Sequence, residues 1–350
     1  MIGTKLVKWT STTAKHFMNL EYKYGCHNYG PIAVVLSKGL GAEVWDVNGK
    51  KYYDLLSAAV NQGHCHPKIK AAAIAQMERI TLTSRAFYSD RLCTWEKYLT
   101  TLLGYDKVCF QNGGVEAIEM AVKFARRWGY VVKGIPDKAR VLFPKDNFWG
   151  RSIAACGSSD DPKRYKNFGP FDLKFGLVEY NNASALEEEF KKDPYICAYI
   201  LEPIQGDAGV IIPSKGYLTK VRELCTKYNV LMAVDECQTG LGRVGRMLAC
   251  DYEGVKPDMI ALGKSLSGGF YPISACLGND NVFDCIRPGD HGSTFGGNPL
   301  ASAIGVVACQ VVIDEKLSEQ AVTQGDYLRD NLKDICGQGL LIGMEYALLT

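Results

Sequence analysis

A lysine placed directly after an apolar run is the first residue of this sequence that could do chemistry. Lys264 follows Met259–Leu262 and leads into the glycine-containing segment Ser265–Gly269. Lysines are normally solvated, so desolvation at the mouth of a buried strand would favour the neutral amine that Schiff-base chemistry requires. The alternative is the tail of a phosphate-binding P-loop, but that motif needs a glycine five residues before Gly263, where Asp258 stands.

Two acids end another apolar run of the sequence. The run Val230–Asp235 is followed by Glu236, which predicts carboxylates at the carboxyl edge of a parallel sheet, where α/β proteins build their sites. An acid at that edge could bind a metal, cap a helix or pair with a cationic ring nitrogen. Because a strand-end lysine follows 29 residues after Asp235, we favour the last role, in which the carboxylate keeps a pyridinium nitrogen protonated.

A glycine turn supplies a candidate anion site. The segment Gln111–Ala117 reads as a strand end, a Gly113-Gly114 turn and a helix start. Backbone N–H groups at a helix N-terminus bind phosphate well, although most Gly-Gly turns merely reverse the chain. Its value here is that it provides the anion site that a phosphorylated cofactor needs.

Two further motifs leave alternatives open. In Asn147–Arg151, an aromatic pair beside an arginine could stack on a planar ring and hold a carboxylate, or could be a packed aromatic with a surface arginine. His64-Cys65-His66 resembles a metal site, but no other Cys/His cluster supports it and three adjacent residues cannot easily face one ion. We therefore expect no metal.

The elements that position these residues alternate between short apolar runs and longer amphipathic ones from about residue 105 onward, which is typical of βαβ units. The short runs are apolar throughout, as expected for parallel strands covered on both faces. Helices are predicted over Val115–Trp128, which has an apolar stripe at helical spacing, and over Tyr217–Tyr228. The predicted strands are Lys107–Gln111, Arg140–Phe143, Ile196–Glu202, Val230–Asp235 and Met259–Leu262.

The chain is expected to contain a large and a small domain. Residues 56–305 form the predicted large cofactor-binding domain, because no linker divides them. Residues 1–55 contain a hairpin-like stretch, Ala42–Tyr53, with a turn at Asn48-Gly49. In residues 306–350 a long helix after Gly305 precedes an apolar piece, Gly339–Met344. We expect both end segments to contribute to the smaller domain, which would be incomplete.

Composition excludes several functional classes. The 350 residues are 47% hydrophobic and 22% charged, and a net charge of +2 does not point to nucleic acid or an anionic membrane. No apolar run approaches the roughly 20 residues that cross a bilayer. The 13 cysteines form no Cys-x-x-Cys pair, which favours buried thiols over disulfides. The segment Met1–Leu20 has lysines but no arginine, so we expect a cytoplasmic protein, with the mitochondrial matrix as the alternative.

Taken together and in this order, the motifs resemble those of the class-III aminotransferases, enzymes of pyridoxal-phosphate (PLP) fold type I. The resemblance covers roughly residues 20–345 and is strongest for the ornithine branch of the family. The residues that carry it are Tyr24–Tyr29, Val60–Pro67, Leu82–Tyr88, Asn147–Arg151, Glu202–Gly206, Asp235–Gly240 and Gly292–Pro299.

This resemblance implies an α/β fold, with a large domain around a mostly parallel seven-stranded sheet and a smaller α+β domain. It implies that Lys264 is the Schiff-base lysine and proton shuttle, and that Asp235 pairs with the pyridinium nitrogen. Thr294 would reach the cofactor phosphate of a neighbouring subunit, so a homodimer is implied. The other implied cofactor residues are Gly113, Gly114 and Val115 at the phosphate, Phe148 on the ring and Gln238 at the phenolic oxygen; the implied substrate residues are Arg151 at the α-carboxylate, Tyr88 and Asp207.

The family reaction of that branch moves the δ-amino group of L-ornithine to a 2-oxo acid, 2-oxoglutarate, and gives glutamate-5-semialdehyde and glutamate in two half-reactions. Three departures bear on it. Ser57–Asn61 lacks two residues of the family pattern, including a substrate-contacting tyrosine; Asp207 replaces a glutamate; and the sequence ends before the family's arginine for the 2-oxoglutarate carboxylate. The alternative functions are a PLP-binding homologue that acts through association, and another ω-aminotransferase.

Overall fold

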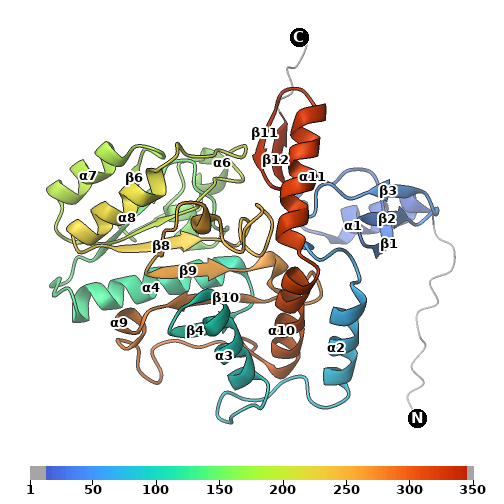
Figure 1. Ribbon diagram of the computed structural model, residues 1–350, viewed down its shortest axis with the longest axis horizontal. Coiled ribbons are helices and arrows are strands. Elements are labelled where there is room, and N and C mark those ends of the chain that lie inside the picture. Colours follow the sequence, from blue (N-terminus) through green and yellow to red (C-terminus); the bar gives the residue numbers. More distant parts are fainter. Residues whose placement is uncertain (1–12, 345–350) are drawn as a thin grey trace. The chain divides into compact units, whose positions relative to one another are not determined.

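The computed structural model describes residues 13–344, which divide into two compact units (Figure 1). The first unit contains the described residues up to Ser57 together with Gly63–His66, and the second contains Ala58–Gln62 and the chain from Pro67 onward. The predicted boundaries at residues 55 and 305 stay a prediction.

The first unit holds a helix and a small antiparallel sheet. Helix α1 spans Ala14–Tyr24, and the strands, in the order β1-β2-β3, are Leu36–Leu40, Glu43–Asp46 and Lys51–Tyr53. The predicted hairpin is therefore confirmed. Its turn has Gly49 at φ +84°, a left-handed conformation that glycine adopts without steric cost, and the Gly49 N–H donates to Asp46 O.

A seven-stranded mixed sheet forms the centre of the second unit, in the order β4-β10-β9-β8-β7-β5-β6. The only reversed strand in this sheet of the described chain is β10, which pairs antiparallel with both β4 and β9. The predicted mostly parallel seven-stranded sheet is confirmed. The strands are β4 Lys107–Gln111, β5 Arg140–Pro144, β6 Gly176–Val178, β7 Ile196–Leu201, β8 Leu231–Asp235, β9 Met259–Leu262 and β10 Ser274–Gly278.

All five predicted strands are found, each with bounds within one residue of the prediction at either end. Two strands of this sheet were not predicted. Strand β6 has three residues, too few to show a pattern, and β10 is a short apolar run whose direction no local signal specifies.

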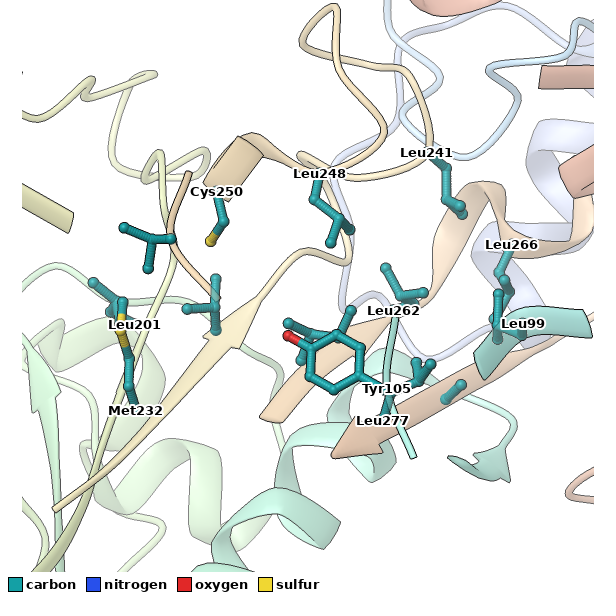
Figure 2. Packing of buried hydrophobic residues seen from close by; sticks show 14 of the residues in the cluster. Leu99, Tyr105, Leu201, Met232, Leu241, Leu248, Cys250, Leu262, Leu266 and Leu277 are labelled. Carbon is teal, nitrogen blue, oxygen red and sulfur yellow. The ribbon is translucent and has the colours of Figure 1, made fainter. Parts of the chain in front are cut away.

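Both faces of the sheet are covered, which explains why its strands are apolar throughout. Successive residues of β8 and β9 point into different cores: Met232 and Ile260 into one, Ala233 and Ala261 into the other. Figure 2 shows part of the first core, in which strand residues such as Leu201, Leu262 and Leu277 belong to one cluster with Leu99 and Tyr105. Helix α4, Gly114–Val131, covers the opposite face and lies against β7, β9 and β10 (Figure 1).

The second unit contains further helices, and none of the helices in residues 13–344 is long and apolar enough to span a membrane. The predicted helix Tyr217–Tyr228 is confirmed as α8 and ends one residue earlier. The helices besides α4 are α2 Pro67–Met77, α3 Leu92–Leu103, α5 Ile153–Gly157, α6 Pro162–Tyr165, α7 Ala183–Lys192, α8 Tyr217–Lys227, α9 Asp280–Phe283, α10 Pro299–Asp314 and α11 Leu317–Asn331, with 3-10 turns at Ala249–Tyr252 and Lys264–Ser267.

The end of the described chain differs from the expectation of one long helix after Gly305. Two helices, α10 and α11, are separated at Lys316, whose φ of +51° interrupts the helical backbone. They are followed by the hairpin β11 Ile335–Gln338 and β12 Leu341–Met344, which contains the predicted apolar piece.

Candidate active site

Chemically active side chains from several strands converge at one edge of the seven-stranded sheet. Asp235 ends β8, Glu202 follows β7, and Lys264 lies two residues after β9. These three strands run parallel, so their carboxyl ends meet at the same edge. The edge is therefore the predicted site region.

Close backbone packing joins three of the predicted motifs. A Cβ on Gly263 would lie 3.3 Å from Cys237 Sγ and 3.5 Å from Gly114 Cα, and a Cβ on Gly114 would lie 3.2 Å from Cys237 Sγ. The turn before Lys264, the glycine turn before α4 and the segment after Asp235 thus touch one another. The Ser274 hydroxyl also donates a hydrogen bond to Gly113 O at 2.7 Å.

Lys264 begins a 3-10 turn directly at this junction. Its φ is +44°, a left-handed conformation that is uncommon for a residue with a side chain and that is frequently found at functional sites. The Lys264 side chain is exposed, so the expected desolvation of its amine is not provided by the described residues. The reason is that the lysine projects from the open end of the sheet, beyond the buried strand that precedes it.

Asp235 is the buried acid of the site, with 9% of its surface exposed. Burial raises the pKa of Asp235, while hydrogen bonds from Cys237 and the positive charge of Lys264 act in the opposite direction. The Cys237 N–H donates to Asp235 Oδ1 at 2.9 Å. A buried carboxylate at the mouth of a site favours a cationic partner, because a charge in a low-dielectric environment is stabilised mainly by an opposite one.

Glu202 is a second buried acid, which the sequence analysis placed in a motif without giving it a role. Its carboxylate accepts hydrogen bonds from the Phe148 N–H at 3.0 Å and the Gly206 N–H at 3.2 Å. Burial and then the charge of Asp235 raise the pKa of Glu202 to about 8, against the smaller opposite effects of these N–H donors and Lys264. The sequence position of Glu202 could have pointed to this role, since Glu202 directly follows the apolar strand β7 just as Asp235 ends β8.

The glycine turn has the geometry of an anion site. Glu116 Oε2 accepts from the N–H groups of Asn112 at 3.1 Å and Gly113 at 2.6 Å, which fixes the first turn of α4. The Gly113 N–H therefore already has an acceptor. The next amides, those of Gly114 and Val115, belong to the first residues of an 18-residue helix. Such amides lack intrahelical acceptors and attract anions.

The turn Asn147–Arg151 packs against the same helix start. Gly150 has φ +143°, and a Cβ there would lie 2.5 Å from Val115 Cγ2, so only glycine permits the approach. Trp149 is buried, stacks on Phe143 and donates to Ser158 Oγ, which assigns it to the core. Of the aromatic pair, the part-buried Phe148 is the one that lies beside an arginine, with the Arg151 guanidinium 5.8 Å from its ring centre.

The other predicted site residues are distributed around this junction or lie on the surface. Gln238 follows β8 and lies so close to Gly206 that a Cβ on that glycine would overlap Gln238 Oε1. Asp207, next to Gly206, forms an ion pair with Arg164, a residue that the sequence analysis did not single out. Thr294 and Tyr88 have exposed side chains, and Tyr88 is fully exposed.

These residues fit pyridoxal phosphate. The amides of Gly114 and Val115 suit its phosphate, the buried Asp235 carboxylate suits its ring nitrogen, and Lys264, whose charge reaches Asp235, supplies the amine. By contrast, no group of three or more His, Cys, Asp or Glu side chains in residues 13–344 could hold a metal ion. His64 instead pairs with Asp54 at 2.6 Å.

Comparisons with known proteins agree on one family. The family described as aminotransferase class-III matches residues 24–346. The sequence is 57% identical to mitochondrial ornithine aminotransferase of Drosophila melanogaster, over 92% of this chain and 77% of that protein. A crystal structure of Toxoplasma gondii ornithine aminotransferase, described as having partial occupancy of PLP at its active site, is 49% identical, with TM-score 0.91 over 93% of this chain and 80% of its own. An acetylornithine aminotransferase from Elizabethkingia anophelis is also 49% identical, with TM-score 0.84 over 94% and 84% of the two chains.

Proposed function

Because the chain belongs to the class-III aminotransferases, we propose that it transfers the δ-amino group of L-ornithine to 2-oxoglutarate, with PLP as cofactor, and forms glutamate-5-semialdehyde and glutamate. The observation that carries this proposal is the junction at which Lys264, the buried Asp235 and the N-terminus of α4 meet. Each of the three supplies a group that PLP requires.

In this proposal the protein's contribution to cofactor binding is divided among a few residues. Asp235 keeps the ring nitrogen protonated, the Gly114 and Val115 amides hold the phosphate, Phe148 stacks on the ring, and Gln238 bonds the phenolic oxygen. Bound PLP supplies an electron sink for charge developing at the substrate carbon. Glu202, protonated at neutral pH because its pKa is about 8, limits the negative charge beside Asp235 and holds the Phe148 backbone in place.

Lys264 has two roles at its Nζ atom. It would hold the cofactor covalently, and its amine would move the proton that leaves the substrate carbon next to the reacting nitrogen. The left-handed backbone and the packing of Gly263 against Cys237 fix the base of the side chain. Arg151 holds the α-carboxylate of ornithine, which leaves the δ-amine as the reacting group; Tyr88 and Asp207 complete the substrate residues.

We also infer a homodimer. Thr294 is exposed on the loop Gly292–Pro299, and that loop is tied to the glycine turn by a hydrogen bond from Asn112 Nδ2 to Ser293 Oγ at 3.1 Å. Large apolar side chains in the second unit are also exposed, among them Phe87 at 71% and Phe295 at 48%. A second copy of the chain would cover such side chains and bring Thr294 to a neighbouring phosphate.

The test of the proposed function is the absorbance of the PLP-loaded protein. We expect a band of lysine-bound PLP that L-ornithine bleaches and 2-oxoglutarate restores, and that is missing from the Lys264→Ala variant. Lys215→Ala, which removes an exposed lysine from the same unit, is the matched control and should behave as the wild type. If the wild-type band does not respond to ornithine, the substrate proposal fails.

A second candidate is N-acetylornithine as amino donor, because a 49% identical relative of known structure carries that name. Acetylation neutralises the α-amine of the donor but leaves its α-carboxylate and δ-amine intact. We expect ornithine to bleach the band faster at equal concentration. The reverse order of rates would assign the chain to the acetylornithine branch, and a band that neither amine bleaches would favour a PLP-binding homologue acting through association.

We propose that the protein is located in the cytoplasm. Plasmodium relatives are named simply ornithine aminotransferase, whereas those of Drosophila are named mitochondrial. This prediction rests on the segment Met1–Leu20, of which residues 1–12 lie outside the described part of the chain. A carboxyl-terminal fluorescent fusion of the full chain tests it, and a mitochondrial signal would contradict the proposal.

A further inference from the structure

We propose that Gln62 is a positioning residue for Lys264. In this assignment its side-chain amide holds the backbone of the turn that begins at Lys264, and thereby sets the place from which the lysine amine reaches the cofactor. The inference rests on the proposed function, in which Lys264 is the cofactor lysine. It adds a residue that precedes Ser265, the neighbour of that lysine, by 203 positions in the sequence.

A short segment of the chain, Ala58–Gln62, brings this amide to the turn. The segment belongs to the second unit, although the residues on either side of it belong to the first. Its residue Val60 lies so close to the end of the turn that a Cβ on Gly269 would be 2.3 Å from Val60 Cγ1. The segment therefore packs directly beside the residues that follow Lys264.

The Gln62 amide makes two hydrogen bonds with its nitrogen. Gln62 Nε2 donates to Ser265 O at 3.0 Å and to Ala308 O at 3.0 Å, so it links the Lys264 turn to helix α10. Both acceptors are carbonyl oxygens, which defines the orientation of the amide. Gln62 is 7% exposed, and hydrogen bonds in a buried environment are stronger than those that compete with water.

The Gln62 oxygen argues against a purely stabilising role of this side chain. Gln62 Oε1 is buried and has no hydrogen-bond partner among residues 13–344. An unpartnered buried acceptor costs free energy, and an apolar side chain of similar size would avoid that cost. The amide is therefore explained by what its nitrogen holds, the carbonyl next to Lys264.

The Lys264 turn needs a constraint from outside because its own hydrogen bonds are few. It is a four-residue 3-10 turn, closed by the Leu266 N–H to Gly263 O at 2.9 Å and the Gly268 N–H to Ser265 O at 3.0 Å. Lys264 itself has φ +44°, and a residue with a side chain keeps such a conformation only when its surroundings enforce it. The buried amide supplies one such constraint.

The hydrogen-bond distances select Gln62 over its neighbour Asn61. The Asn61 N–H reaches Ser265 Oγ at 3.4 Å, and that hydroxyl reaches Ala58 O at 3.5 Å, both longer than ordinary hydrogen bonds. The Asn61 side chain is directed elsewhere, since its Nδ2 donates to Leu241 O at 3.0 Å. The 3.0 Å bond from Gln62 to Ser265 O is therefore shorter than either of these two contacts between the segment and the turn.

Position matters for Lys264 because its amine must meet both the cofactor and the substrate carbon. A misplacement of about 1 Å at a reacting group can slow a step by about a hundredfold. Loss of the Gln62 bond frees the Ser265 carbonyl and with it the backbone that carries the amine. The Gly114 and Val115 amides proposed for the phosphate belong to α4, so we expect phosphate binding to change little.

The rate of covalent attachment of PLP to the apoprotein tests this assignment without any amino acid substrate. The Lys264 amine and the PLP aldehyde condense with loss of water, borohydride reduces the resulting link by adding hydride, and peptide mass spectrometry locates it. We expect Gln62→Met, which keeps the volume but removes both N–H donors, to slow attachment about ten- to one-hundredfold. The affinity for pyridoxamine phosphate, which carries an amine in place of the aldehyde, should stay unchanged.

Gln76→Met is the matched control, because Gln76 is another buried glutamine of the same unit. It is 2% exposed, and its Nε2 donates to Ile80 O at 2.8 Å, a carbonyl outside the Lys264 turn. Both substitutions should lower the temperature of thermal unfolding, but only Gln62→Met should slow attachment. An attachment rate in Gln62→Met equal to that of the wild type would overturn the proposal, as would equal slowing in both variants.

A milder variant and a backbone measurement cover the case in which Gln62→Met folds poorly. Gln62→Asn keeps an amide on a shorter side chain and should slow attachment less than Gln62→Met. Hydrogen exchange of the apoprotein reports on the turn directly: the Leu266 and Gly268 amides, which close it, should exchange several-fold faster in both Gln62 variants and as in the wild type in Gln76→Met. Unchanged exchange at these amides in the Gln62 variants would also overturn the proposal.

The same variants separate this proposal from the proposed function. In the PLP-loaded protein, Gln62→Met should lower kcat for ornithine with little change in its KM, because the lysine is displaced and the substrate residues are not. A wild-type protein that attaches PLP but is inert to ornithine would refute the proposed substrate, while the attachment rates would still decide the role of Gln62. A wild type that does not attach PLP would refute the proposed function, and hydrogen exchange would then decide whether Gln62 holds the turn.

Discussion

At the scale of single residues, two buried carboxylates share the site and are held in different ways. Glu202 accepts two backbone N–H groups, and Asp235 accepts hydrogen bonds from Cys237, so both are oriented by the chain that follows their strands. Burial raises the pKa of each, and the charge of Asp235 raises that of Glu202 further. This arrangement favours one negative charge at the site instead of two.

The first prediction concerns the pH dependence of stability. The pKa of Glu202 is about 8 in the folded chain, above its ordinary value of 4.5, so the folded protein keeps a proton that the unfolded chain loses between these values. The contribution of Glu202 to the free energy of unfolding is fully present below pH 4.5. It is lost as the pH rises to about 8, by at most ~1.4 kcal/mol per pH unit. Denaturant unfolding of the apoprotein from pH 5 to 8 should show that the free energy of unfolding decreases less steeply with pH in Glu202→Gln than in the wild type. Parallel profiles of the two proteins would contradict the assignment.

The second prediction concerns Asp235 and the cofactor. Asp235→Asn removes the negative charge proposed to face the ring nitrogen, so PLP should bind about ten- to one-hundredfold more weakly, the usual worth of a charge-assisted hydrogen bond. Fluorescence titration of the apoprotein with PLP measures the affinity. Asp284→Asn, which neutralises an exposed carboxylate, is the control. An affinity equal to that of the wild type would show that Asp235 does not contact the ring.

At the scale of elements, the start of α4 combines a cap and an anion site. Glu116 occupies the N–H groups of Asn112 and Gly113, which leaves the following amides for phosphate. Glu116→Ala should lower the free energy of unfolding by about 1 kcal/mol through the lost cap and should also weaken PLP binding. Thermal unfolding with and without PLP measures both effects, with Glu119→Ala on the same helix as control. Loss of stability without loss of affinity would separate the cap from the phosphate site.

Gly150 determines how the Asn147–Arg151 turn meets α4. Gly150→Ala places a Cβ 2.5 Å from Val115 Cγ2 at a φ of +143°, so the turn must move. We expect a loss of about 1–3 kcal/mol in stability and weaker PLP binding, because Phe148 and Val115 are displaced together. Gly134→Ala is an informative comparison, since its φ is also positive but a Cβ there meets no atom within 4 Å. Equal effects of the two substitutions would assign the loss to backbone strain alone.

At the scale of the whole molecule, the proposed homodimer determines whether the site is complete. Light scattering should give twice the chain mass of 38.5 kDa. Phe87→Asp, which places a charge on a 71% exposed aromatic position, should shift the protein toward monomer and lower PLP affinity, because Thr294 of the partner is lost. Tyr130→Asp, on an exposed part of α4, is the matched control. A wild-type protein that stays monomeric at micromolar concentration would refute this assembly.

The sequence by itself determined five strands of the central sheet, the long helix α4 and the class of chemistry. Apolar runs such as Met259–Leu262 and the stripe of α4 are local signals, because burial on two faces leaves a continuous apolar run and burial on one face leaves a helical period. Lys264 and Asp235 were identified because charged residues that follow or end apolar strands are placed at the edge of the sheet, where α/β proteins build their sites. The resemblance to class-III aminotransferases, and with it the fold and the cofactor, was confirmed by the comparisons.

Only the tertiary structure decided the rest. The reversal of β10 depends on pairing with β4 and β9, which lie far from each other in sequence. Whether an acid is buried, as for Glu202, or paired, as for Asp207 with Arg164, depends on packing between loops that no local pattern encodes. Arg164 carries no motif of its own, and its place beside Phe148 arises from the fold of α6 onto the turn after β5. Strand-end residues can be read from the sequence because buried parallel strands are continuous apolar runs, whereas loop contacts are set by the three-dimensional packing.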